Sequence, residues 1–529
     1  MKGTLRFLLG VFVCVLGCTR AEPAHKRVND NRLVVLIAVN GLRGDEIERY
    51  WPLWRYGFRR FLEDGHYYSE AVYRHGNTGL ATGSATLSTG VSPRLHGIVG
   101  NEIFLEDESR TVRVCEGDQA PCGANALLVP TLVDRLKSRS PDSKVLVLSQ
   151  EKLSARLLGG ASADALLWFD KSEFKLAGEL ASRSEEEFLA YQRYFESIAG
   201  LDRISRIWEL PRIPRPFSDR LDGRIGEWDN GHGVTFPHYL DESDPQKLRQ
   251  LWGRTPDSDR ALGDLAAFLL RKLEMGRDST VDYCVLSFSA VDHVGHDYGP
   301  HSVERIAVLM ELDRTLGDLL EVIEKQTEAR ALIALTSSSG IGPTVAEARD
   351  KKKNGARISE GELLSYLNEA LKLRFADHNY IKSITFPFVY LDVDGSRQRK
   401  EVTLAVTTLL SEHPAVYRAW AVDSLGTDPD PVAQAIYETH HQHRSGDIAF
   451  VLRPYQAIES SLRGEFGAES GSPWYYDRHV PVMVLGHKVA EGRTGTKVSV
   501  IDLVRTLGDE LELRVDVEGG NPLSQAIAY

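Results

Sequence analysis

An aspartate and a histidine four residues apart, Asp292 and His296, are the residues of this sequence best suited to chemistry. They follow the apolar run 284–288, so both side chains can turn toward one cation where that run ends. Carboxylate oxygen and imidazole nitrogen are ligands that suit zinc. The spacing alone is common in proteins. The alternative is that the two side chains hydrogen-bond each other or the surrounding loop.

Short apolar runs predict the framework that positions these residues, and they lie at 33–39, 145–148, 284–288, 331–335 and 480–485. Their apolarity is continuous, which is typical of strands buried on both faces of a parallel sheet. Residues 303–325 have the apolar spacing of an amphipathic helix. This alternation predicts an α/β fold, a doubly wound and mostly parallel sheet with helices on both faces. The domain would span residues 32–529, with inserted cap subdomains at roughly 155–255 and 345–455.

Polar residues follow four of these runs: Asn40, Ser149 to Lys152, Ser289 to Asp292, and Thr336 to Ser339. In open α/β sheets the ligand site lies at the carboxyl ends of the strands. We therefore expect these segments to converge on one site.

The string from Asp292 to Pro300 reads Asp-His-Val-Gly-His-Asp-Tyr-Gly-Pro. It resembles the D-x-x-G-H-x-x-G-P motif of the alkaline phosphatase superfamily, particularly its phosphate monoesterase and nucleotide phosphodiesterase branches. Further segments resemble the same family and occur in its order, at 90–101, 253–256, 313–317, 445–447 and 476–481. The resemblance covers nearly all of the chain after residue 32 and implies the alkaline phosphatase fold.

In that family two zinc ions hold the attacking and leaving oxygens of phosphoryl transfer, and a Ser or Thr forms a covalent intermediate. Carried onto this sequence, the position of that nucleophile is Leu80, whose side chain has no lone pair. Thr78 and Thr82 are each two residues away, so their side chains would point elsewhere. The resemblance therefore implies that no phosphoenzyme forms.

By the same correspondence, most positions of the family's zinc ligands carry other residues in this sequence. Four ligand positions carry neutral side chains here: Asn40, Ser338, Ser339 and Ser470. The family has Asp at the first of these, Asp and His at the next two, and His at the last. Only Asp292 and His296 remain, so we expect no cofactor. Glu469 or His293 could instead complete a site for one zinc ion.

Residues on the phosphate side are also altered. Asn101 matches a phosphate-binding donor of the family, although Gly100-Asn101 is equally a turn pair. The Lys and Arg that contact phosphate in the monoesterases map to Gln150 and Lys152. His479, in the segment 476–481, is interpreted as structural.

The N-terminus resembles a bacterial lipoprotein signal. Lys2 and Arg6 precede a short apolar run, 7–16, which is too short to span a bilayer in the ordinary way. The run leads into Val-Leu-Gly-Cys, which resembles a lipobox, so Cys18 would be acylated as the first mature residue. The alternative is an ordinary cleaved signal. Residues 1–18 are thus predicted to be a signal peptide and residues 19–31 a tether.

The three cysteines beyond the predicted signal peptide are a pair and a single residue. Cys115 and Cys122 are seven residues apart across a turn-like segment, and an exported protein would permit a disulfide between them. Cys284 lies in an apolar run and is predicted to be a buried, inert thiol.

Composition bounds the function. The 529 residues are 42% hydrophobic and 26% charged, which excludes a disordered chain. The net charge is −12 without a basic block, so nucleic acid is not an expected partner. We expect a non-catalytic binding or scaffold lipoprotein on the periplasmic side of a bacterial envelope, held to the membrane by its lipid. The alternatives are a residual or single-metal phosphatase or phosphodiesterase, and a purely structural envelope component.

Overall fold

The computed structural model describes residues 30–117, 120–170, 175–215, 217, 222–231, 233–240, 243–375, 378–393, 395–459, 463–513, 515 and 519–527. The predicted signal peptide, Cys18 and the tether up to residue 29 lie outside these ranges, so their interpretation stays a prediction. Within the described ranges no helix is both long enough and apolar enough to cross a bilayer.

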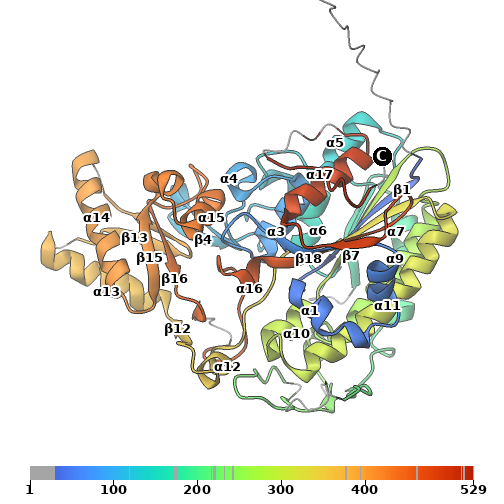
Figure 1. Cartoon of the computed structure of the whole chain (residues 1–529), viewed down its shortest axis with the longest axis horizontal. Helices are drawn as coiled ribbons and strands as arrows, with labels where there is room; N and C mark the ends of the chain where they lie inside the picture. The colour runs from blue at the N-terminus through green and yellow to red at the C-terminus, as the bar shows by residue number, and fades with distance from the viewer. Residues whose placement is uncertain are drawn as a thin grey trace, which may run out of the picture.

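A ten-stranded sheet forms the centre of the molecule, in the order β19-β2-β18-β11-β1-β10-β5-β6-β7 with β20 beside β2 (Figure 1). Its strands are β1 Leu33–Val39, β2 His66–Val72, β5 Val145–Ser149, β6 Ala165–Asp170, β7 Lys175–Leu180, β10 Asp282–Phe288, β11 Ala331–Thr336, β18 His479–Gly486, β19 Gly492–Thr494 and β20 Val498–Ser499. The strands from β11 to β6 pair in parallel, while β18 and β7 are antiparallel to their neighbours. The predicted mostly parallel sheet is confirmed.

Two hydrophobic cores cover the two faces of this sheet. In β1 the side chains of Leu33, Val35 and Ile37 enter one core, and those of Val34 and Leu36 enter the other. This is why the run is apolar at every position. The first core includes α1 Gly44–Arg49, α2 Gly57–Glu63, α7 Glu185–Ala199, α8 Pro245–Trp252, α9 Pro256–Lys272, α10 Ala290–Tyr298 and α11 Val303–Thr327. The second includes α3 Leu80–Thr89, α5 Leu132–Arg139, α6 Lys152–Gly159 and α17 Val500–Glu510.

The region predicted as a cap at 155–255 contributes to the central sheet, which differs from its interpretation as an insertion. Strands β6 and β7 extend the sheet beyond β5, because the apolar run that begins at Ala165 is buried on both faces. Only the part after α7 lies outside the α/β pattern, and it contains the short strands β8 Ile207–Trp208 and β9 His238–Tyr239.

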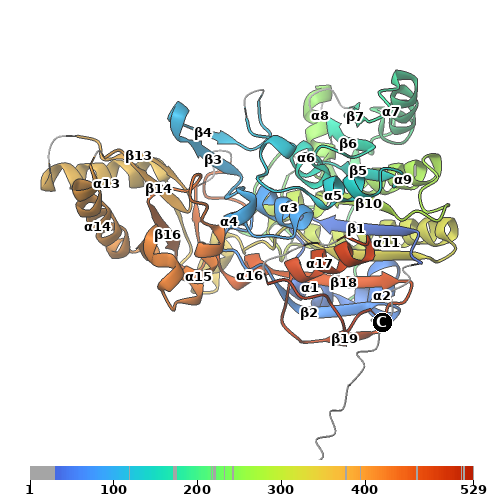
Figure 2. The same cartoon turned by 90° about the horizontal axis from the view of Figure 1, so that it is seen from above.

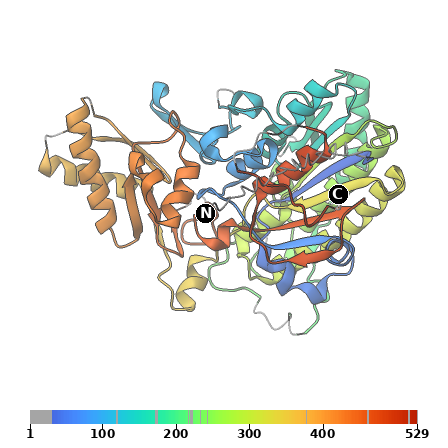
Figure 3. The same cartoon turned by 45° about the horizontal axis from the view of Figure 1, so that its top comes forward.

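A second sheet lies within residues 345–455 and stands beside the main body (Figures 2 and 3). Its antiparallel strands follow the order β13 Ile381–Thr385, β14 Phe388–Leu391, β16 Ile448–Leu452 and β15 Val416–Ala421. One face packs on α13 Glu360–Arg374 and α14 Ser396–Glu412. The other face shares a core with α3, α15 Pro431–Thr439 and β3 Glu102–Leu105, which attaches the insertion to the main body.

Shorter elements connect these layers. They are α4 Pro93–His96, β4 Arg110–Arg113, which pairs with β3, α12 Val345–Asp350, β12 Ala356–Ile358, which pairs with β17 Gln456–Ile458, and α16 Tyr475–Arg478. Among the described residues, 3-10 turns lie at Trp51–Leu53, Glu106–Glu108, Gly123–Asn125 and Val422–Thr427.

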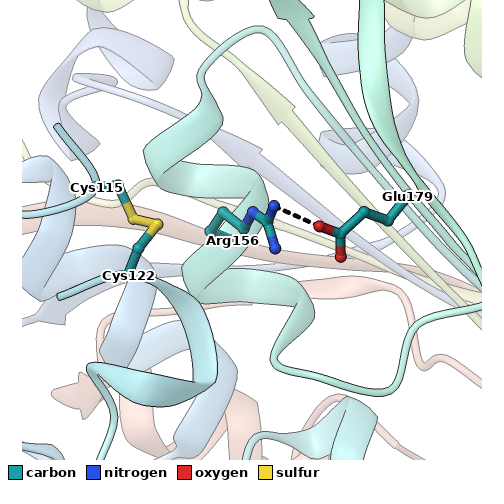
Figure 4. The surroundings of a disulfide bond; sticks show 4 residues. All are labelled: Cys115, Cys122, Arg156 and Glu179. Carbon is teal, nitrogen blue, oxygen red and sulfur yellow. Dashed lines mark hydrogen bonds and ion pairs between the residues drawn. A yellow bond between two sulfur atoms is a disulfide. The ribbon is translucent and has the colours of Figure 1, made fainter. Parts of the chain in front are cut away.

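Cys115 and Cys122 are joined by a disulfide in the segment that leads from the β3–β4 hairpin toward α5 (Figure 4). The backbone N–H of Cys115 also donates to the carbonyl of Pro121, 3.0 Å away, which closes the same turn. Beside it on α6, Arg156 pairs with Glu179 of β7. Cys284 is fully buried in β10, and burial raises the pKa of its thiol.

Candidate functional site

Asn40 follows β1 and lies in a buried cluster of serine hydroxyls. Its Nδ2 donates to Oγ of Ser287 at 3.1 Å and to Oγ of Ser289 at 3.0 Å, both at the end of β10. Its Oδ1 accepts from Oγ of Ser338, at 2.8 Å, after β11. All four residues are at most 1% exposed. The ends of three neighbouring strands therefore meet through uncharged side chains that hydrogen-bond one another.

Gln150, after β5, extends this network. Its Oε1 accepts from the backbone N–H of Ser289 at 3.1 Å, and its Nε2 donates to Oδ1 of Asp259 on α9 at 2.6 Å. Asp259 also accepts from the backbone N–H of Ala290 at 3.2 Å. Burial raises the pKa of this carboxyl to about 7. The predicted convergence of the strand ends is thus present, but Gln150 binds protein groups. Lys152 is exposed at the start of α6.

Helix α3 begins at Leu80, whose half-buried side chain lines a cavity of about 580 Å³. No side chain of residue 79 can cap this helix, because that residue is glycine. Oδ1 of Asn101 instead accepts from the backbone N–H of Ala81 at 2.9 Å. Asn101 therefore caps α3 from twenty residues away in the sequence, a role that neither the turn pair nor the family correspondence predicted.

The two threonines near Leu80 do not replace a nucleophile at its position. Oγ1 of Thr82 donates to the carbonyl of Gly79 at 2.9 Å, within the first turn of α3. Thr78 is fully buried, and its side chain is not part of the cavity wall.

Asp292 and His296 lie side by side on α10, with Oδ1 and Nε2 3.5 Å apart. Nδ1 of His296 is 2.7 Å from the carbonyl oxygen of Ala468, which can only accept, so Nδ1 carries the hydrogen. The other ring nitrogen, Nε2, faces the Asp292 carboxylate. His296 thus hydrogen-bonds a segment that is distant in the sequence and not the loop next to it.

The other residues considered as zinc ligands contact other protein groups or lie away from Asp292 and His296. The ring nitrogens of His293 are 2.8 Å from the carbonyl oxygen of Gly253 and 2.9 Å from Oε1 of Glu151. Glu469 pairs with Arg357 at 3.1 Å, and its other oxygen is 3.8 Å from Nδ1 of His296. Ser470 is half-buried in the cavity wall. His479 bonds the backbone carbonyl of Ser69 at 2.8 Å, which agrees with a structural role.

The residues present do not fit a two-zinc centre. Across the described ranges no group of three or more His, Cys, Asp or Glu side chains is arranged to hold a metal ion. At the first of the lost ligand positions, both hydrogens of the Asn40 amide are already donated to hydroxyl groups. Ser338 and Ser339 are buried and uncharged. A divalent cation here would lack the charged ligands that stabilise it in proteins.

Residues 34–473 match the model of the type I phosphodiesterase / nucleotide pyrophosphatase family. The chain belongs to this family. Within the alkaline phosphatase superfamily, it is 24% identical over 550 residues to alkaline phosphatase PafA of Elizabethkingia meningoseptica, covering 99% of both chains. Alkaline phosphatase PhoD of Zymomonas mobilis is also 24% identical, over 93% of this chain and 87% of that protein.

Two solved structures have the same fold as this chain. The crystal structure of wild-type PafA superposes with a TM-score of 0.85 at 22% identity, covering 95% of this chain and all of that one. Murine ectonucleotide pyrophosphatase / phosphodiesterase 5 gives a TM-score of 0.56 at 13% identity, over 94% of this chain. The predicted alkaline phosphatase-like fold is thereby confirmed.

Some residues of the site carry no signal in the sequence. Asp259 lies inside α9, where an acidic residue ordinarily marks an exposed helix face, yet here it is 1% exposed. Asp477 is equally buried in the short helix α16 and lines the cavity. Only the family segment 476–481 could have pointed to Asp477.

Proposed function

We propose that this member of the type I phosphodiesterase / nucleotide pyrophosphatase family is a non-catalytic binding protein of the cell envelope. The observation that carries the proposal is the cluster formed by Asn40 and the serines around it. A di-metal site needs negative charge at this point, and a site without its metal would leave buried carboxylates repelling one another. Here the amide and three hydroxyls satisfy each other without any ion.

The nucleophile position supports the same interpretation. Leu80 stands at the start of α3, facing the cavity in which a substrate of the family would have to lie. A leucine side chain can neither attack phosphorus nor bind a metal. The cavity remains, so binding is the function that the retained geometry supports.

Metal content and turnover together test the proposal. We expect the purified protein to contain clearly less than two zinc ions per chain and to release no nitrophenol from p-nitrophenyl phosphate or bis(p-nitrophenyl) phosphate. The matched control is the Asp292→Ala/His296→Ala double variant, which should give the same background rate. Zinc-dependent turnover in the wild type that is absent from the double variant would overturn the proposal.

A second candidate is a residual phosphatase that uses one zinc ion. The observation that favours it is the geometry of His296, whose Nδ1 donates to the Ala468 carbonyl while Nε2 stays available near Asp292. A backbone acceptor that fixes the tautomer in this way is usual for histidine ligands of zinc. The relatives named as alkaline phosphatases agree with this candidate too. One zinc per chain together with turnover would favour it.

Restoring single residues should not create activity. Leu80→Thr supplies a hydroxyl, but without a second metal nothing would lower its pKa. Ser338→Asp and Ser339→His rebuild part of one metal site and still leave Leu80. Because such groups act as a unit, we expect measurable turnover only when these three changes are combined with Asn40→Asp and Ser470→His.

A further inference from the structure

The cavity beside Leu80 is bounded by both parts of the molecule. The main body contributes the start of α3 and the β3–β4 hairpin, and the insertion contributes the start of α13 and the segment 452–459. Its volume of about 580 Å³ lies in the range of sites that hold small organic molecules.

The charge of its wall is unsuited to a phosphate ester. Six acidic side chains line it: Glu102, Glu116, Glu360, Glu459, Glu469 and Asp477. The only basic side chains of the wall are Arg113 and Arg357. Acidic groups therefore outnumber basic groups by four, and a phosphate dianion entering the cavity would meet net repulsion.

Both arginines are already paired with these acids. Nε of Arg113 lies 2.9 Å from Oε1 of Glu102, and its Nη1 lies 3.6 Å from Glu116. Nη1 of Arg357 lies 3.1 Å from Oε1 of Glu469, and its Nη2 donates to the carbonyl oxygens of Phe466 and Gly467. Arg357 is thus held by protein acceptors and Arg113 is shared between two carboxylates, so neither brings uncompensated positive charge to the wall.

Three of the six acidic side chains, Glu360, Glu459 and Asp477, form no ion pair with a described side chain, and the first two belong to the insertion. Glu360 accepts one hydrogen bond, from the backbone N–H of Phe386 at 3.2 Å. Glu360 and Glu459 leave negative charge in the part of the wall that the insertion contributes.

Aromatic rings line the same cavity. Tyr455 and Tyr476 line the cavity and stack with their centroids 5.7 Å apart and an interplanar angle of 24°. The Tyr476 hydroxyl accepts from the backbone N–H of Tyr455 at 3.2 Å, which fixes the pair. Phe386 supplies a third ring. Aromatic faces next to carboxylates are the usual environment for an organic cation.

A buried carboxylate oxygen of the wall also lacks a partner. Oδ2 of Asp477 accepts from the backbone N–H of Ser472 at 2.9 Å and from its hydroxyl. Oδ1 of Asp477 is buried and accepts no hydrogen bond from the residues that the structure describes. Such an acceptor is costly to bury unless a donor reaches it, and a ligand N–H group would satisfy it.

From this combination we infer that the cavity binds a small organic cation, carrying a guanidinium or amine group, between the Tyr455–Tyr476 pair and the carboxylates of Glu360 and Glu459. This inference rests on the proposed non-catalytic function and names its ligand class. It also accounts for a cavity that persists where the phosphate-binding groups of the family are replaced.

Calorimetric titration of the purified full-length protein in detergent tests the inference. The probes are arginine amide and citrulline amide, both acetylated on the α-amine so that the guanidinium group carries the only charge, and p-nitrophenyl phosphate. We expect arginine amide to bind at least about tenfold more tightly than citrulline amide, and more weakly as salt is raised. The phosphate ester should not bind measurably.

Variants locate the site. Glu360→Gln/Glu459→Gln should weaken arginine amide binding about tenfold, and Tyr455→Leu several-fold. The control is Glu185→Gln/Glu186→Gln, which removes the same charge from the first turn of α7, away from the cavity. Its affinity should equal that of the wild type.

The outcomes separate the two proposals. Equal affinity for the charged and uncharged probes, no binding of arginine amide, or tighter binding of the phosphate ester would each overturn the cationic ligand class. Loss of affinity in the α7 control variant as large as in the cavity variant would also overturn it. Turnover of the phosphate ester in the same samples would contradict the non-catalytic function independently of these affinities.

Discussion

At position 40 the difference between a metal ligand and a structural residue is a single side-chain group. The Asn40 amide both donates and accepts among Ser287, Ser289 and Ser338, and no water-exposed atom takes part. A carboxylate of the same shape would bring a charge into this cluster. The hydroxyls could turn to donate to it, but they could not replace the lost hydration completely.

Asn40→Asp should therefore destabilise the protein by about 2 kcal/mol at pH 8. The new carboxyl group is buried, so its folded-state pKa is raised. The carboxyl group then stays protonated to a higher pH in the folded state than in the unfolded state. The destabilisation relative to wild type therefore grows as pH rises from 4 to 8. Urea unfolding at both pH values measures this.

The control for this variant is Asn125→Asp, which makes the same change at an exposed turn. Its stability should match the wild type at both pH values. Adding zinc should not restore Asn40→Asp. Zinc-induced recovery of its stability would mean that a metal site survives and would contradict the argument from Asn40.

Asp259 makes the wild-type protein itself pH-sensitive. Burial raises the pKa of its carboxyl from 3.8 to about 7, while the unfolded chain keeps an ordinary value. Between these values the folded state binds more protons than the unfolded state. The contribution of Asp259 is therefore fully present below about pH 4 and is lost as pH rises toward 7, by at most about 4 kcal/mol.

Asp259→Asn should remove this slope. In urea unfolding between pH 4 and 7, the difference in stability between variant and wild type should shift in favour of the variant as pH rises. The amide can still accept from Gln150 and from the Ala290 N–H through its oxygen. A difference that stays constant across this range would show that Asp259 does not titrate there.

Among the elements, one buried ion pair ties together four segments near α10. Arg305 of α11 and Glu46 of α1 are both fully buried, with Nη2 and Oε2 2.7 Å apart and Nε and Oε1 2.8 Å apart. Arg305 also donates to the carbonyls of Gly41, at 2.6 Å, and of Val291. The loop after β1 and the start of α10 are therefore held by one guanidinium group.

Replacing one partner of this ion pair should destabilise the protein more than replacing both. Arg305→Met leaves the Glu46 carboxylate buried and unpaired, so we expect a loss of about 3–5 kcal/mol. Glu46→Leu/Arg305→Met should recover part of that loss, because no uncompensated charge remains. The free energy of unfolding in urea checks both variants. A double variant less stable than Arg305→Met alone would contradict this electrostatic explanation.

For the whole molecule, the sequence predicts the strands whose residues are all apolar. It does not predict features that depend on residues far away in the sequence. The run 33–39 coincides with β1, because every residue there faces one of two cores. The sequence predicts a cap where strands β6 and β7 lie, because the charged, Trp- and Pro-rich sequence that follows them outweighs the short apolar run at Ala165.

The residues of the site also differ in whether the sequence predicts their roles. Asn40 and Ser338 could be assigned as lost ligands because each directly follows a recognisable strand. The role of Asn101 as a cap for α3 could not be predicted, since its partner, the backbone N–H of Ala81, comes within reach only through the way the β3–β4 hairpin lies against that helix. The charge of the cavity depends on several segments at once, and no local pattern in the sequence records that sum.

A prediction that concerns the whole protein is its attachment to the membrane through Cys18. The short apolar run and the residues before Cys18 predict acylation of its thiol and of the new N-terminus. Each buried methylene of an acyl chain contributes roughly 0.8 kcal/mol, so several chains hold a protein to a bilayer stably. We expect wild-type protein to incorporate labelled palmitate and to enter the detergent phase of Triton X-114. Cys18→Ser should lose both properties, whereas Cys14→Ser, which changes a cysteine of the same run, should keep them. Palmitate labelling of Cys18→Ser at the wild-type level would refute the anchor, and the binding protein proposed here would then have to reach its ligand without one.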